Sequence, residues 1–377
     1  MKVEFLKHNL GINELKSIKK VFDSIFLTGG PTTEKFEQEF AKYLGIKSVI
    51  GVSCGTSALY LALKAYKIGP GDEVILPALT FMSTANAIES VGARPIFVDV
   101  DRVTANVDPK LIIKKINKKT KAIIPVHLYG QMADMVAVKK IAKKYKLIII
   151  EDSAQCVEGI RDGFKPGQLS HAACFSFHAI KNITCGEGGA IATNDQKIAG
   201  MLKKMRVQGM DRLLNKRYQD KKYTPWDLKT ITGKFPFSEI QAALLLPQIK
   251  LLEPRLKIKN QLTKYYQKRL NNLTGIELLK TARKTKHAYT NFAILVNQKK
   301  RDDIIYQLKN NGIGVIVNFY PIVQLLTYYQ KKYHHRAGSF PIAEEISKRV
   351  ISLPLYPKLK KSEIDYVVKT LAKIVKS

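Results

Sequence analysis

The chain has 377 residues, of which 45% are hydrophobic and 25% are charged, which is the composition of a globular protein with room for one large and one smaller domain. No apolar run reaches the ~18 residues of a membrane span, and residues 1–9 lack the apolar stretch of a secretory signal, so we expect neither a membrane partner nor export. The formal net charge of +32 would suit a nucleic-acid-binding protein, but the lysines are dispersed over predicted helix faces. We therefore expect no nucleic-acid partner, and we expect the positive electrostatic field to attract small anions.

The first two-thirds of the chain alternate short apolar strands with amphipathic helices, which predicts an α/β fold with a mainly parallel sheet. The predicted strands are 48–52, 73–76, 95–99, 122–126 and 147–150, and the predicted helices are about 57–66, 83–91 and 109–117. The last two strands are continuous apolar runs, as expected of strands that are buried on both faces.

The remaining part of the chain predicts a second, smaller unit. A helix that starts near Ser238 should bend or break at Pro247, and a long helix follows at about 255–271. A strand at 291–296 and a helix at 301–311 then indicate an α+β region. We therefore expect a large α/β domain over residues 1–250 and a small α+β domain over residues 251–377.

Ligands of open α/β sheets bind beyond the carboxyl ends of the strands, and one such end is a glycine-containing turn at 51–58. This turn opens a helix, whose backbone N–H groups together with the hydroxyls of Thr56 and Ser57 could bind a phosphate. Ser57 could equally cap its own helix. The turn alone leaves both interpretations open.

Two further strand ends carry Asp152 and Lys181. Asp152 directly follows a buried strand, where a carboxylate needs a partner such as a pyridinium nitrogen, although it could also cap the next turn. Lys181 lies between an apolar stretch and a glycine-rich turn, and a lysine at the edge of an apolar site can form a Schiff base with an aldehyde. Ser176 could give a further hydroxyl to a phosphate. The four cysteines lack CxxC spacing, so we expect no metal site and a reducing cytoplasm.

In combination these segments resemble the sugar aminotransferases of the DegT/DnrJ/EryC1/StrS family, a branch of the aspartate-aminotransferase-like fold (PLP fold type I). The resemblance runs in order over nearly the whole sequence. Its segments are 30–44, 51–63, 77–81, 95–101, 125–131, 151–155, 176–189, 238–244 and 352–357. The resemblance implies that pyridoxal 5′-phosphate (PLP) is the cofactor.

The resemblance also implies roles for the matched residues. Lys181 would hold PLP through a Schiff base and then move the proton between the substrate and the coenzyme. Asp152 would pair with the pyridine nitrogen, Gln155 would lie near the ring, and Phe81 would stack on its face. The implied phosphate ligands are Thr56, Ser57 and Ser176. A related dehydratase group carries histidine in place of the lysine, so Lys181 favours transamination.

In this family two subunits complete each active site, so the resemblance implies a homodimer with shared sites. Many relatives have an asparagine that reaches the neighbouring subunit's phosphate, and Lys234 stands in its place here. Lys234 could serve as a point-charge ligand or face solvent. The His-Tyr pair that is common before a proline is replaced by 318–320. The implied substrate contacts are Thr28, His178, Asn318 and Tyr320.

The expected reaction transfers an amino group from L-glutamate to a nucleotide-diphosphate keto-sugar. His178 and residues 181–184 resemble members that aminate C4 of a 4-keto-6-deoxyhexose. Amination at C3 and a cyclitol ketone as acceptor are alternatives within the family. A non-catalytic PLP-binding regulatory protein of the same fold and a basic nucleic-acid-binding protein are alternatives of other classes.

Overall fold

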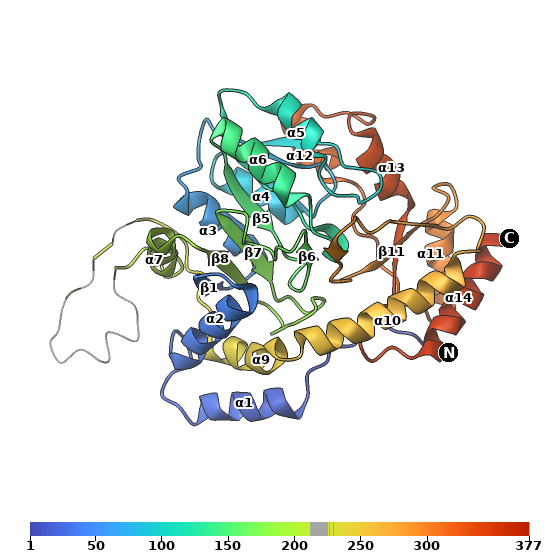
Figure 1. The fold of residues 1–377 in the computed structure, drawn as a ribbon, viewed down its shortest axis with the longest axis horizontal. Coiled ribbons are helices and arrows are strands. Elements are labelled where there is room, and N and C mark those ends of the chain that lie inside the picture. The colour runs from blue at the N-terminus through green and yellow to red at the C-terminus, as the bar shows by residue number, and fades with distance from the viewer. Residues whose placement is uncertain (212–224, 226, 229, 377) are drawn as a thin grey trace.

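A central seven-stranded sheet organises the larger part of the chain (Figure 1). The computed structural model describes residues 1–211, 225, 227–228 and 230–376. The strands, in spatial order, are β1 (Ser48–Val52), β8 (Gly189–Thr193), β7 (Ala172–Ser176), β5 (Ile148–Asp152), β4 (Thr120–Ile123), β2 (Glu73–Pro77) and β3 (Arg94–Val98). Only β8 runs antiparallel to its neighbours in this sheet, so the predicted α/β fold with a mainly parallel sheet is confirmed.

Helices cover both faces of this sheet because successive strand residues point to opposite sides. Ile150 faces a core formed with helices α3 (Gly55–Ala65), α4 (Met82–Ser90) and α7 (Gln196–Met205). Ile149 faces the opposite core, which is formed with α5 (Pro109–Lys115) and α6 (Met135–Tyr145). Beside it, α2 (Pro31–Leu44) and α9 (Glu239–Ile249) cover β7 and β8 (Figure 1).

Two local details differ from the sequence-based expectation. Strand β5 continues to Asp152, so this carboxylate belongs to the last strand residue instead of following the strand. Helix α9 is not broken at Pro247 but continues to Ile249, because a proline in the last turn removes a single hydrogen bond. The long helix α10 (Leu252–Leu270) starts directly afterwards.

A second core lies around a small antiparallel sheet of β12 (Val350–Leu353), β11 (Phe292–Leu295) and β9 (Glu277–Leu278). Helices α10, α11 (Arg301–Asn310) and α14 (Lys361–Lys376) pack on it. Val3 also belongs to this core, where it pairs with Ile313. The division of the chain near residue 250 stays a prediction.

The remaining elements are α1 (Ile12–Phe22), α12 (Thr327–Tyr333) and α13 (Pro341–Arg349), the 3₁₀ turns η1 (Leu128–Gly130) and η2 (Val323–Leu325), and a two-stranded ribbon of β6 (Ile160–Arg161) and β10 (Thr285–Lys286). Helix α1 packs against α9 at the bottom of the view in Figure 1. In the described part of the chain no helix has the length and apolarity to cross a membrane.

Candidate active site

A cavity of about 270 Å³ lies at the carboxyl ends of the parallel strands, where an α/β sheet is expected to bind its ligand. Eight of the residues singled out in the sequence line it together. They are Thr56, Phe81, Asp152, Gln155, Ser176, His178, Lys181 and Asn318. Strand ends and helix starts converge at this site. They bring together residues as far apart in the chain as Thr56 and Asn318, which are separated by 262 positions.

Asp152 is held at the end of β5 by two hydrogen bonds. Its Oδ2 accepts from the hydroxyl of Thr84 at 2.7 Å, and its Oδ1 accepts from the backbone N–H of Ala154 at 3.1 Å. Because the Thr84 hydroxyl has a single proton, the 2.8 Å contact between Thr80 and Thr84 must have Thr80 as the donor. This chain of hydroxyls fixes the carboxylate, which is only 5% exposed, toward the cavity. Sequence reasoning missed both threonines.

Lys181 ends the turn that follows β7, where its backbone N–H donates to the carbonyl of His178 at 2.9 Å. Its side-chain amine makes no hydrogen bond to any residue that the structure describes. Burial lowers the pKa of this amine, and the attraction of Asp152 opposes that shift. A lysine with a lowered pKa is neutral more often, and the neutral amine is the nucleophile.

The amino terminus of α3 forms a concave backbone surface beside the cavity. The backbone N–H groups of Gly55 and Thr56 have no protein acceptor among the described residues, and the Thr56 side chain is exposed to the cavity. A Cβ at Gly55 would lie 3.0 Å from Cβ of Ser176, and a Cβ at Gly189 would lie 2.4 Å from the carbonyl of Cys54. Glycine at these positions therefore allows a close backbone approach, and the free N–H groups can bind an anion.

Ser57 is not part of the cavity wall. Its hydroxyl donates to the carbonyl of Cys54 at 2.8 Å and accepts from the backbone N–H of Cys54 at 3.1 Å. The second of these contacts and the bond from the backbone N–H of Ser57 to Sγ of Cys54 at 3.4 Å form a capping box at the start of α3. Of the two interpretations of Ser57, the geometry supports the helix cap.

An aromatic pair, Phe81 and Phe319, borders the cavity, with ring centroids 5.3 Å apart. Phe81 is 47% exposed, so a ring face is available for stacking. Asn318 is buried beside it, and its carbonyl accepts from the hydroxyl of Tyr129. Tyr320 does not line the cavity: its ring lies 4.1 Å from the guanidinium of Arg301.

Three more polar side chains reach the cavity. Gln155 accepts the backbone N–H of Tyr129 at 2.7 Å through Oε1, while its amide nitrogen donates to no described residue. His178 and Glu187 lie opposite each other, with Nε2 and Oε1 3.5 Å apart. Glu187 was not among the residues singled out in the sequence, because only the folded turn brings it opposite His178.

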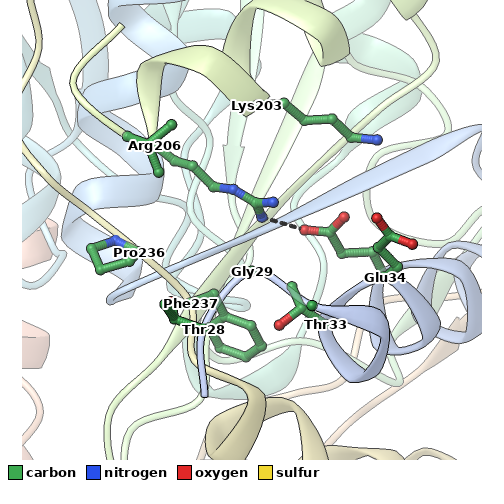
Figure 2. A pocket seen from close by; sticks show the side chains of 11 residues that line it. Thr28, Gly29, Thr33, Glu34, Lys203, Arg206, Pro236 and Phe237 are labelled. Carbon is green, nitrogen blue, oxygen red and sulfur yellow. Dashed lines mark hydrogen bonds and ion pairs between the residues drawn. The ribbon is translucent and has the colours of Figure 1, made fainter. Parts of the chain in front are cut away.

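Thr28 and Lys234 lie outside this cavity. Thr28 borders a separate small hollow of about 40 Å³ with Arg206 and Phe237, which Figure 2 shows. The guanidinium of Arg206 is paired there with Glu37 at 2.5 Å. Lys234 is exposed, and its backbone bridges to Val207. A single chain thus does not bring Thr28 or Lys234 to Lys181, and their contacts with a neighbouring subunit stay predictions.

The groups that line the cavity fit PLP. Lys181 offers an amine, Asp152 a fixed carboxylate, and the N-terminus of α3 unpaired N–H groups beside the hydroxyls of Thr56 and Ser176. These match an aldehyde, a pyridine nitrogen and a phosphate in chemical type. Phe81 supplies an exposed ring for the flat face.

The chain matches known proteins over almost its whole length. The model of the DegT/DnrJ/EryC1/StrS aminotransferase family matches residues 9–372. The spore coat polysaccharide biosynthesis protein SpsC of Bacillus subtilis (strain 168) is 36% identical over 380 residues, which cover 99% of this chain and 97% of SpsC.

The matches to solved structures also cover almost the whole chain. The structure of DesV from S. venezuelae has a TM-score of 0.89 and 32% identity over 97% of this chain and 94% of DesV. The sugar aminotransferase candidate Spr1654 of Streptococcus pneumoniae has been solved in a PLP-form and a PMP-form. The latter has a TM-score of 0.94 and 26% identity over 100% of this chain and 99% of Spr1654. These matches confirm the expected family and its aspartate-aminotransferase-like fold class.

Proposed function

The chain belongs to the DegT/DnrJ/EryC1/StrS aminotransferase family and is a PLP-dependent sugar aminotransferase, and from this premise we propose that it transfers the amino group of L-glutamate to C4 of a nucleotide-linked 4-keto-6-deoxyhexose. The observation that carries the catalytic assignment is the placement of the Lys181 amine in one cavity with the fixed carboxylate of Asp152. The choice of C4 rests on His178 and residues 181–184. Amination at C3 and amination of a cyclitol ketone are the alternatives to amination at C4.

Four residues of the cavity have a proposed task in this reaction. When bound, PLP supplies an electron-accepting ring. The Lys181 amine would hold the cofactor and would move the proton at Cα of the amino donor. Asp152, acting as an anion fixed by Thr84, keeps the ring nitrogen protonated. Gly55 and Thr56 hold the phosphate through N–H groups at the helix terminus.

The substrate side of the proposal is supported by charge and by the cavity wall. A net charge of +32 attracts an anionic nucleotide sugar. Asn318 and His178 line the cavity and are the proposed sugar contacts, while Thr28 and Tyr320 would contribute from outside it. Because SpsC is named for polysaccharide biosynthesis, we place the amino sugar in a polysaccharide pathway, with the reaction in the cytoplasm.

We also propose that the working unit is a homodimer. Large apolar side chains lie on the surface of α1 and the segment after it, where Ile12 is 64%, Phe22 65% and Ile25 87% exposed. A second copy would remove this apolar surface from water. Thr28 follows the same segment, so the partner could bring it and Lys234 to the neighbouring site.

The test is a panel of nucleotide keto-sugars and a cyclitol ketone offered with glutamate to the PLP-loaded protein, with the product identified by mass and by the position of the new amine. A 4-amino-6-deoxyhexose product supports the proposal. A 3-amino sugar or an aminocyclitol as the product would show that the proposed acceptor is wrong while keeping the aminotransferase assignment. A cofactor spectrum that no amino donor alters would favour a regulatory PLP-binding protein, and salt-sensitive nucleic-acid binding without cofactor would favour the basic binding protein.

A further inference from the structure

Lys259 is a buried ammonium group beside the loop that carries Lys181. It lies on α10, is 4% exposed, and donates from Nζ to Oδ1 of Asn182 at 2.7 Å and to the carbonyl of Ala288 at 3.4 Å. Lysines are rarely buried to this extent, because desolvation of the charge is costly unless partners replace the water. The cost indicates that this ammonium has a specific task.

Asn182, the residue directly after Lys181, is fixed between two buried charges. Its Oδ1 accepts from Lys259, while its Nδ2 donates to Oε2 of Glu158 at 2.7 Å and to the carbonyl of Ala288 at 3.0 Å. Glu158 is 2% exposed, so the amide links a buried cation to a buried anion. Only one orientation of the amide satisfies both partners, because its oxygen must face the ammonium and its nitrogen the carboxylate.

The next residues of the loop are held in the same way from the neighbouring helix. Gln248 on α9 accepts from the backbone N–H of Thr184 at 3.1 Å and donates to its carbonyl at 2.7 Å. Helices α9 and α10 therefore hold the loop at Thr184 and at Asn182. The Lys181 side chain itself has no hydrogen bond to the described residues, so no polar partner fixes its amine, and the anchored loop backbone fixes where the side chain begins.

We propose that Lys259 is a positioning residue that acts through Asn182 to present the amine of Lys181 to the cavity, a role that rests on the proposed function of Lys181. Lys259 lies outside the cavity wall and does not touch the substrate or cofactor site. Its contribution is geometric: loss of the ammonium releases the Asn182 oxygen, removes a cation that stabilises the carboxylate of Glu158, and loosens the residue that follows Lys181.

The experiment compares Lys259→Met and Asn182→Ala with the wild-type protein and with Lys264→Met, which removes an exposed lysine from the same helix. Two quantities are measured well below the melting temperature of every variant. One is the fraction of bound PLP that a brief borohydride pulse attaches to Lys181, determined by peptide mapping. The other is the rate of the half-reaction with glutamate in a single turnover.

We expect Lys259→Met to lower both quantities about tenfold or more, since displacement of a reacting group by about 1 Å can cost ~100-fold in rate. Asn182→Ala should have a similar effect, and the double variant should be no worse than either single one, because both remove the same contact. Lys264→Met should match the wild-type protein. A Lys259→Met protein with a lower melting temperature but wild-type trapping and rate would overturn the inference.

A second variant covers the case in which Lys259→Met fails to fold. Lys259→Met combined with Glu158→Gln removes both buried charges, which is better tolerated than leaving one unpaired. It should fold and still lose trapping and rate, whereas wild-type values in this variant would also overturn the inference. If the wild-type protein itself shows no PLP attached to Lys181, the proposed function fails first.

Discussion

The hydroxyl of Thr84 donates a 2.7 Å hydrogen bond to Oδ2 of Asp152, and the carboxylate it fixes lines the same cavity as the amine of Lys181. Both Thr84 and Asp152 are almost fully buried, with exposed fractions of 0% and 5%. A buried carboxylate needs such donors, and here they also fix its direction. With the role proposed for Asp152, the cofactor chemistry therefore depends on a helix residue, Thr84, as well as on the strand residue that bears the charge.

Asp152→Asn should slow both half-reactions by about 100-fold or more, because the ring nitrogen loses its anionic partner. The amide is nearly isosteric, so the melting temperature should change little. Single-turnover kinetics with glutamate and then with the keto-sugar measure the two steps separately. Equal rates for Asp152→Asn and the wild-type protein would remove Asp152 from the mechanism.

Thr84→Val should lower the free energy of unfolding by about 1.5–3 kcal/mol, since it removes a hydrogen bond to a charged group in a buried site. Thr84→Ser keeps the hydroxyl and is the matched control. Denaturant unfolding of the cofactor-free proteins gives the difference. If the valine and serine variants are equally stable, the hydroxyl does not stabilise Asp152.

Thr56 and Ser57 form a matched pair that separates phosphate binding from helix capping. Thr56→Val should weaken PLP binding several-fold with little effect on stability, because its side chain faces the cavity. Ser57→Ala should instead cost about 1 kcal/mol of stability, as expected for the loss of an N-terminal capping interaction. Equilibrium titration with PLP and denaturant unfolding measure the two effects. A Ser57→Ala protein that loses PLP affinity at unchanged stability would reverse the assignment.

The attachment of PLP to the cofactor-free protein should become faster as pH rises and level off above the pKa of Lys181, because only the neutral amine reacts. Burial lowers this pKa and Asp152 opposes the shift, so Asp152→Asn should move the midpoint to still lower pH. Stopped-flow absorbance over a pH series measures it. Glu187→Gln, which changes another carboxylate of the cavity wall, should leave the midpoint in place. A midpoint that rises in Asp152→Asn would contradict the electrostatic account.

The fold could be predicted well where local patterns decide it. The strand at 48–52 and the helix at 301–311 were expected within a residue of where they lie, since apolar periodicity and turn residues define them. The extension of β5 to Asp152 was missed, because its last two residues are charged and read as a loop. They remain in the strand through pairing with β7, a long-range contact.

The site could be predicted only as a set of residue types. Lys181 and Asp152 are marked in the sequence by the apolar runs that precede them, and the structure brings them together. Thr84 and Lys259 carry no such mark, because a helix threonine and one lysine among many look like surface residues until their partners are known. Ser57 stayed ambiguous for a related reason: the same hydroxyl suits a phosphate or a helix cap, and only the distance to Cys54 decides.

The most direct test of the central role of Lys181 is the turnover of Lys181→Ala with glutamate and the accepted nucleotide keto-sugar, together with its retention of PLP on gel filtration. The variant should fold, show no measurable amino transfer, and release PLP on the column, because no covalent bond holds it. Transamination at the wild-type rate by Lys181→Ala would contradict the assignment of this lysine and the roles built around it.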